Sequence, residues 1–145
     1  MDLTPQGDAS NADEVVEFRA TYQDANGAED LQEVRFRAHN DRENFTVMTL
    51  SYDASDNTLW ARDEYGAWIG GFSPGSDETI ETRYFKLNVR DTTVTRNGDQ
   101  LEVKWTVRFT SRLGEADMTL LLHTFDREGE DTGYEEMGEW HVHEE

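Results

Sequence analysis

The chain has 145 residues, enough for one domain with a buried core but too few for a catalytic domain with a separate regulatory one. Its 32 acidic and 13 basic residues give a formal net charge of -19, which disfavours nucleic acids and anionic membrane surfaces as partners. Because the chain has no cysteine, disulfides, thiolate metal sites and cysteine nucleophiles are excluded.

The basic residues are almost all arginine, since only Lys86 and Lys104 are lysines. An acidic, lysine-poor surface stays solvated at high salt, so a halophilic, saline habitat is one hypothesis. No apolar run approaches the roughly 20 residues of a membrane-spanning helix. Residues 1–14 also lack the basic and apolar regions of a signal peptide. We therefore expect that any export signal lies outside this chain or never existed.

Apolar and polar residues alternate with a period of two along most of the chain, as in antiparallel strands with one solvated face. Segment 1–12 is expected to be a loose N-terminal lead-in. The segment 101–109, LEVKWTVRF, shows the alternation best and places Trp105 on its apolar face. The segment 118–125 is apolar on both faces and should lie centrally. The expected strands, in chain order, are 15–22, 33–39, 45–52, 84–89, 101–109, 118–125 and 135–142.

The segments between these strands are rich in glycine, asparagine and aspartate, the residues of tight turns. The one short helical candidate is 110–116, where Gly114 argues against more than a turn. Both prolines, Pro5 and Pro74, lie outside the expected strands. The pattern predicts a single all-β domain spanning 1–145, an antiparallel β-sandwich of about seven to nine strands.

Four segments resemble bacterial immunoglobulin-like sandwich domains found in large surface and secreted proteins. The first is a strand ending in Tyr22, followed by D-x-N-G-x-x-D-L at 24–31 and by V-x-F at 34–36. The others are LSYDASDNTLWARDEYGAW, NGDQLEVKWTVRFT and GYEEMGEWHV, in which Gly138 and Trp140 match a closing G-x-W. Each motif is weak alone, but their order and spacing span nearly the whole chain.

The resemblance implies a non-catalytic spacer, stalk or adhesion module of an exported or cell-surface protein. Its partners would be neighbouring domains of a longer chain, or a protein or glycan surface. Such domains often carry a cysteine pair, and the aligned positions here are Met48 and Phe85. An apolar pair can replace a disulfide by packing, with the loss of about 2 to 4 kcal/mol of cross-link stabilisation.

One segment matches a catalytic motif: GFSPG at 71–75 fits the G-x-S-x-G nucleophile elbow of hydrolases. That motif requires a strand, a turn and a helix, and no helical period follows Ser73. The residue after the serine must also donate its backbone N–H to the oxyanion, and Pro74 has none. Carboxylates are too abundant for any pair to indicate acid/base chemistry. We therefore expect no enzyme.

The four histidines give little indication of a metal site. His141 and His143 share one face of the last expected strand, where two imidazoles can hold zinc or nickel if a neighbour supplies a third ligand. A solvated chain end is the simpler and preferred explanation for them. His39 is expected in a loop, and His123 is expected to be a hydrogen-bonded core or edge side chain.

Three aromatic residues form the candidate ligand site of an alternative function. Trp60, Tyr65 and Trp68 lie close together in the expected hairpin LWARDEYGAW. An exposed group of this kind could be a ligand platform, so the alternative is a carbohydrate-binding module. Packing of the hairpin over the end of the sandwich would explain the same residues.

The acidic turns contain a candidate calcium site. An EF-hand is excluded, because with Gly27 at the sixth loop position the first ligand would be Tyr22. A sandwich-type site needs only six to eight oxygens from two adjacent loops. The candidate calcium ligands are Asp24, Asn26, Asp30, Asp126, Glu128 and Asp131.

Overall fold

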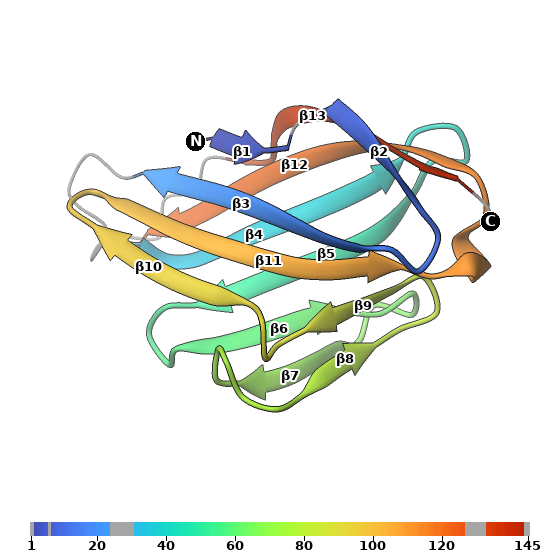
Figure 1. The fold of residues 1–145 in the computed structure, drawn as a ribbon. Coiled ribbons are helices and arrows are strands. Elements are labelled where there is room, and N and C mark those ends of the chain that lie inside the picture. Colours follow the sequence, from blue (N-terminus) through green and yellow to red (C-terminus); the bar gives the residue numbers. More distant parts are fainter. Residues whose placement is uncertain (1, 6, 24–30, 127–132, 144–145) are drawn as a thin grey trace.

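The computed structural model describes residues 2–5, 7–23, 31–126 and 133–143. These residues form an all-β sandwich of two sheets. In Figure 1 the sheet that contains β3 and β11 lies in front of the sheet that contains β4 and β5. The fold class predicted by the alternation is confirmed.

The first sheet, sheet A, has six strands and the order β1-β3-β11-β9-β8. Strand β10 continues the same edge of β11 beyond β9, because β9 pairs with the end of β11 and β10 with its beginning. The strand bounds are Asp2–Thr4 (β1), Val15–Gln23 (β3), Thr79–Glu81 (β8), Phe85–Asn88 (β9), Thr93–Asn97 (β10) and Gln100–Phe109 (β11).

The second sheet, sheet B, has seven strands and the order β2-β13-β12-β4-β5-β6-β7. All its pairs are antiparallel except β13 and β2, which run parallel. The strand bounds are Gly7–Asn11 (β2), Leu31–Asn40 (β4), Phe45–Asp53 (β5), Thr58–Arg62 (β6), Trp68–Phe72 (β7), Ala116–Asp126 (β12) and Glu135–His143 (β13).

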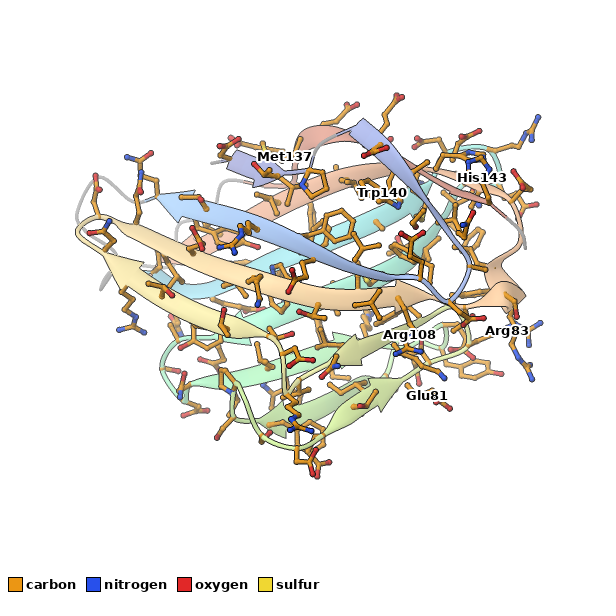
Figure 2. All side chains as sticks on the ribbon, in the orientation of Figure 1. Glu81, Arg83, Arg108, Met137, Trp140 and His143 are labelled. Carbon is orange, nitrogen blue, oxygen red and sulfur yellow. The ribbon has the colours of Figure 1, made fainter. Side chains whose placement is uncertain are left out.

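The core lies between the two sheets and is filled by the apolar faces of the alternating strands. Trp105 is completely buried there, as the alternation in β11 predicts. Aromatic rings of the two sheets contact one another in the core. The ring centre of Phe18 in sheet A lies 5.0 Å from that of Phe36 and 4.9 Å from that of Trp140, both in sheet B. Trp140 and His143, both labelled in Figure 2, show the alternation along β13, since Trp140 is buried and His143 is exposed.

The predicted strands correspond to strands of the structure. Segment 118–125 falls in β12, which lies inside sheet B between β13 and β4, as its two apolar faces predict. The helical candidate 110–116 forms only a 3₁₀ turn at Ser111–Leu113. Within the described ranges there is no α-helix, and no helix is long and apolar enough to cross a membrane.

The beginning of the chain differs from the expected loose lead-in. Residues 2–4 pair with β3 in sheet A, and residues 7–11 pair with the last strand in sheet B. Pro5 lies between these two short strands, and Leu3 and Ser10 are buried. The described part contains thirteen strands, more than the seven to nine expected, because short polar strands such as β2 lack a clear apolar alternation.

The aligned positions of the missing cysteine pair are both in the core. Met48 lies on β5 in sheet B, Phe85 lies on β9 in sheet A, and neither is accessible to solvent. Apolar side chains therefore fill both positions.

Candidate functional site

The outward face of sheet B carries a row of polar and aromatic side chains. The register places Arg35 of β4 opposite Ser51 of β5, and Ser51 opposite Trp60 of β6. These residues alternate with core residues along their strands, so all three side chains point away from the sandwich interior. The neighbouring row pairs Glu33 with Asp53 across the same strands.

The two tryptophans of the β6–β7 hairpin lie in one pocket on this face. The pocket has a volume of about 280 Å³. Trp60 is half-buried, and 38% of Trp68 remains exposed. The lining residues are Glu33, Arg35, Ser51, Asp53, Trp60 and Trp68. We call this the tryptophan pocket.

Two glycines in β7 make room for the Trp60 ring. The register shifts between Leu59 and Trp60, so that β7 holds one residue more than β6 at this point, a β-bulge. Gly70 has a φ of +138°, and a Cβ there would lie 2.5 Å from the Leu59 carbonyl oxygen. A Cβ on Gly71 would lie 3.4 Å from the indole of Trp60. The bulge and the missing side chains thus allow the ring to lie across β7.

Two charged side chains of the tryptophan pocket, Glu33 and Arg35, form an ion pair with each other. Glu33 accepts hydrogen bonds of 2.6 Å from both Arg35 and Ser51. The guanidinium of Arg35 also lies 5.2 Å from the Trp68 ring centre and 4.9 Å from that of Phe125. Burial lowers the pKa of Arg35, but the hydrogen bonds to Glu33 and Tyr134 outweigh it and raise that pKa overall. Arg35 is therefore a fixed cation with a set orientation.

The third predicted aromatic residue, Tyr65, lies outside the tryptophan pocket. It belongs to the turn between β6 and β7 and is 87% exposed. Asp63 forms this turn by accepting the backbone N–H groups of Tyr65 and Ala67. The structure therefore brings together Trp60 and Trp68, and it adds four polar residues that the sequence analysis did not identify. Their only sequence signal is an outward position in the alternation of β4 and β5.

Most of the candidate calcium ligands lie outside the described residues. These are Asp24, Asn26, Asp30, Glu128 and Asp131. Asp126 is the last residue of β12, and its backbone pairs with Leu31, the first residue of β4. Calcium binding by this set stays a prediction.

The serine of the GFSPG segment and two of the histidines lie on different elements of the structure. Ser73 follows β7 in an exposed turn, in which its carbonyl accepts the N–H of Ser76. His39, expected in a loop, instead lies within β4 beside Thr46 and Asn44. His123 is buried, with its ring 4.3 Å from Phe125 and 4.5 Å from Tyr134.

Comparisons of the chain with protein-family models, with curated proteins and with solved structures find no match. A functional assignment therefore depends on the geometry of the chain's own residues.

Proposed function

We propose that the chain is a non-catalytic adhesion module of an exported or cell-surface protein. In this proposal it is an immunoglobulin-like sandwich that binds a carbohydrate in the tryptophan pocket. The observation that carries the proposal is the convergence of Trp60 and Trp68 with four hydrogen-bonding side chains on one solvent-facing sheet.

The strand order supports the immunoglobulin-like part of the proposal. Variable-type immunoglobulin sandwiches have strands A, B, E and D in one sheet and G, F, C, C′ and C″ in the other. Strands β1, β3, β11 and β9 occupy the places of the first set. Strands β13, β12, β4, β5 and β6 occupy the places of the second, and β2, β7, β8 and β10 are additional.

The chemistry of the tryptophan pocket supports a carbohydrate ligand. A sugar ring presents C–H groups on its faces, which pack on indole rings, and hydroxyl groups at its edge. The indoles of Trp60 and Trp68 offer the first kind of contact. Glu33 and Asp53 can accept hydrogen bonds from hydroxyl groups, and Arg35 can donate to them. A small number of polar groups in an aromatic pocket is typical of small-molecule sites.

A titration with a panel of soluble sugars, followed by tryptophan fluorescence and calorimetry, tests this proposal. We expect one sugar class to change the emission and to release heat in the intact protein. Trp60→Ala and Trp68→Ala should each weaken that binding about fivefold or more, since a ring packed on an aromatic side chain contributes roughly 1 kcal/mol and about 1.4 kcal/mol corresponds to tenfold in affinity. Tyr65→Ala removes an exposed aromatic ring outside the pocket and is the matched control, which should bind normally.

Absence of a response to every sugar would contradict a carbohydrate ligand and would favour a spacer. Equal weakening by Tyr65→Ala and Trp60→Ala would contradict the assignment of the pocket. Circular dichroism of each variant separates loss of binding from loss of folding.

A second candidate is a protein partner bound to the same face. Its supporting observation is that arginines lie over aromatic rings there, Arg35 and Arg62 over Trp68 and Arg37 over Tyr134. Tryptophan, tyrosine and arginine are enriched at the centres of protein interfaces. Two results would favour this candidate: free sugar does not displace the protein partner, and Arg37→Ala weakens binding of that partner. Arg37 is informative because it lies outside the tryptophan pocket.

A further inference from the structure

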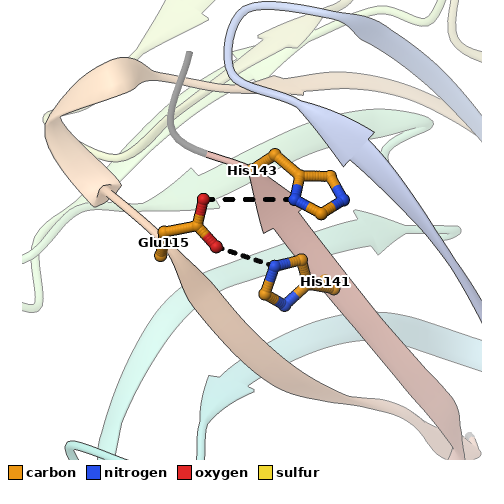
Figure 3. Close-up of side chains that lie close together, drawn as sticks. All are labelled: Glu115, His141 and His143. Carbon is orange, nitrogen blue, oxygen red and sulfur yellow. Dashed lines mark hydrogen bonds and ion pairs between the residues drawn. The ribbon is translucent and has the colours of Figure 1, made fainter.

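Strands β12 and β13 bring two histidines and two carboxylates together on the outward face of sheet B. Asp117 pairs with His141, and Ala116 pairs with Val142, so the antiparallel register places Glu115 beside His143. Val142 is buried, and therefore His141 and His143 on either side of it point outward. Figure 3 shows Glu115 reaching both imidazole rings.

The side chains of this cluster already lie within contact distance. The Nε2 atom of His141 is 2.9 Å from one Glu115 carboxylate oxygen, and the Nδ1 atom of His143 is 4.0 Å from the other. The two imidazole rings meet edge to face, with their centres 4.5 Å apart. One ligand atom from each of Glu115, His141 and His143 lies within 4.8 Å of the others.

We propose that Glu115, His141 and His143 bind a divalent transition-metal ion, with zinc as the best fit. Two imidazole nitrogens and one carboxylate form a three-residue ligand set that suits zinc and leaves a fourth position for water or a ligand atom. Calcium and magnesium prefer oxygen ligands only, so the two imidazoles disfavour them.

The ligand atoms lie near one another, but farther apart than in a formed tetrahedral zinc site. Zinc–nitrogen and zinc–oxygen bonds of about 2.0 to 2.2 Å place neighbouring ligand atoms roughly 3.3 Å apart. The two Glu115 oxygens lie 2.9 Å from the His141 nitrogen and 4.0 Å from the His143 nitrogen, and one ligand atom from each of the three residues lies within 4.8 Å of the others. Metal binding therefore requires these partly exposed side chains to rotate and bring the three atoms around one ion.

Asp117 orients His141 for this role. Its carboxylate lies 2.6 Å from Nδ1 of His141, and Nε2 lies 2.9 Å from Glu115. In the metal-bound state Nδ1–H would donate to Asp117 and leave Nε2 free to bind the metal. Zinc-bound histidines commonly donate their second ring N–H to a carboxylate, and loss of that partner typically weakens metal binding 10- to 100-fold. Asp117 is thus a positioning residue, while the metal would replace the contact between His141 and Glu115.

The surroundings of the cluster attract cations. His141 also borders a hollow of about 660 Å³ that is lined in part by Asp8, Asp41, Asp117 and Glu139. With the net charge of -19, this surface raises the local concentration of any divalent cation. A test must therefore separate ligation by the three residues from diffuse attraction.

Calorimetric titration of the chelator-treated chain with zinc chloride at 0.15 M salt provides that test. We expect one zinc ion per chain. Asp117→Asn should weaken zinc binding about 10- to 100-fold, and His141→Ala, His143→Ala and Glu115→Gln should each weaken it more than Asp117→Asn does. Glu139→Gln removes an exposed charge from the same hollow and should leave the affinity within about twofold, as should His39→Ala, which removes a histidine elsewhere on sheet B.

Equal effects of Glu115→Gln and Glu139→Gln would overturn the proposal, because they would indicate attraction by charge alone. Equal affinity for calcium and zinc, or no zinc binding at all, would also overturn it. All substituted side chains are at least partly exposed, so each variant should keep the unfolding temperature of the parent chain in chelator.

Discussion

At the scale of single residues, Tyr22 connects the two sheets through its hydroxyl group. The hydroxyl donates to the carbonyl oxygen of Arg35 over 3.0 Å and accepts from the indole N–H of Trp105 over 3.4 Å. Burial is the main cause that raises the pKa of the Tyr22 phenol well above its ordinary value of 10.0. The folded protein therefore keeps this proton when the unfolded chain has lost it.

This pKa shift predicts an alkaline loss of stability. Below pH 10 both states hold the proton, so the contribution of Tyr22 is fully present there. Above pH 10 only the folded state holds it, and the free energy of unfolding should fall by up to about 1.4 kcal/mol per pH unit. Urea unfolding of the parent chain and of Tyr22→Phe between pH 8 and pH 11 measures this.

The substitution Tyr22→Phe should cost about 1 to 2 kcal/mol at pH 8, because the Arg35 carbonyl loses its donor. It should also flatten the alkaline slope. Tyr65→Phe, at a residue that is 87% exposed, is the matched control for removing one phenol. An equal slope in the parent chain and in Tyr22→Phe would contradict the assignment.

Gly70 provides the second prediction at this scale. Its φ of +138° and the nearby Leu59 carbonyl leave no room for a side chain. Gly70→Ala should lower the free energy of unfolding by about 2 to 3 kcal/mol, and the displaced bulge should shift the emission of Trp60. Thermal unfolding and fluorescence measure the two effects. Gly7→Ala, where a Cβ meets no atom within 4 Å, should change neither.

At the scale of elements, two threonines join β11 to the break between β9 and β10. Thr92 is fully buried; its hydroxyl donates to the Asn88 carbonyl over 2.7 Å and accepts the Thr106 N–H over 3.2 Å. The Thr106 hydroxyl donates to the Asp91 carbonyl over 2.9 Å. Between β9 and β10, where no strand of the described chain pairs with this edge of β11, these side-chain hydrogen bonds replace the backbone hydrogen bonds of a continuous edge strand.

Replacement of Thr92 by valine should therefore leave buried backbone groups without a partner and cost about 1 to 3 kcal/mol. Thr106→Val should cost about 1 kcal/mol, and the double variant should cost less than the sum, since both act on one hydrogen-bond network. Denaturant unfolding of the four proteins gives the coupling energy. Thr95→Val, at an exposed position of β10, is the control; additive single effects would contradict a shared network.

The sequence predicts the main elements because their apolar residues repeat with the strand period. Trp105 in β11 and the doubly apolar β12 are examples. It does not predict which outward residues meet. Glu115 and His143 are far apart in the chain, and only the register of β12 with β13 brings them together. Trp60 and Trp68 are recognisable as neighbours within one hairpin, whereas Glu33 and Ser51 join them only through pairing of β4, β5 and β6.

At the scale of the whole molecule, the net charge of -19 on 145 residues is the dominant property. Like charges repel most strongly in the compact folded state. The Debye length, beyond which salt screens this repulsion, falls from about 30 Å at 0.01 M salt to about 3 Å at 1 M. Most ion pairs among the described residues, such as Arg19 with Glu102, are exposed and contribute little to stability. Relief of repulsion should therefore dominate the response to salt.

We expect the unfolding temperature at pH 7 to rise by roughly 5 °C or more between 0.01 and 1 M sodium chloride. The same titration near the sequence pI of 4.4 should show a much smaller rise, because the net charge is then close to zero. Calorimetry with chelator present excludes metal binding as the cause. Equal rises at both pH values would show that salt acts otherwise than by screening.

The place of β13 between β12 and the parallel strand β2 has a consequence for synthesis on the ribosome. Residues 7–11 are synthesised long before their only strand partner in the described chain, which comes from residues 135–143. Until these residues emerge, β12 also has a bare edge that can pair with another nascent chain. During translation sheet A can therefore form first, whereas sheet B is complete only after residues 135–143 have been synthesised.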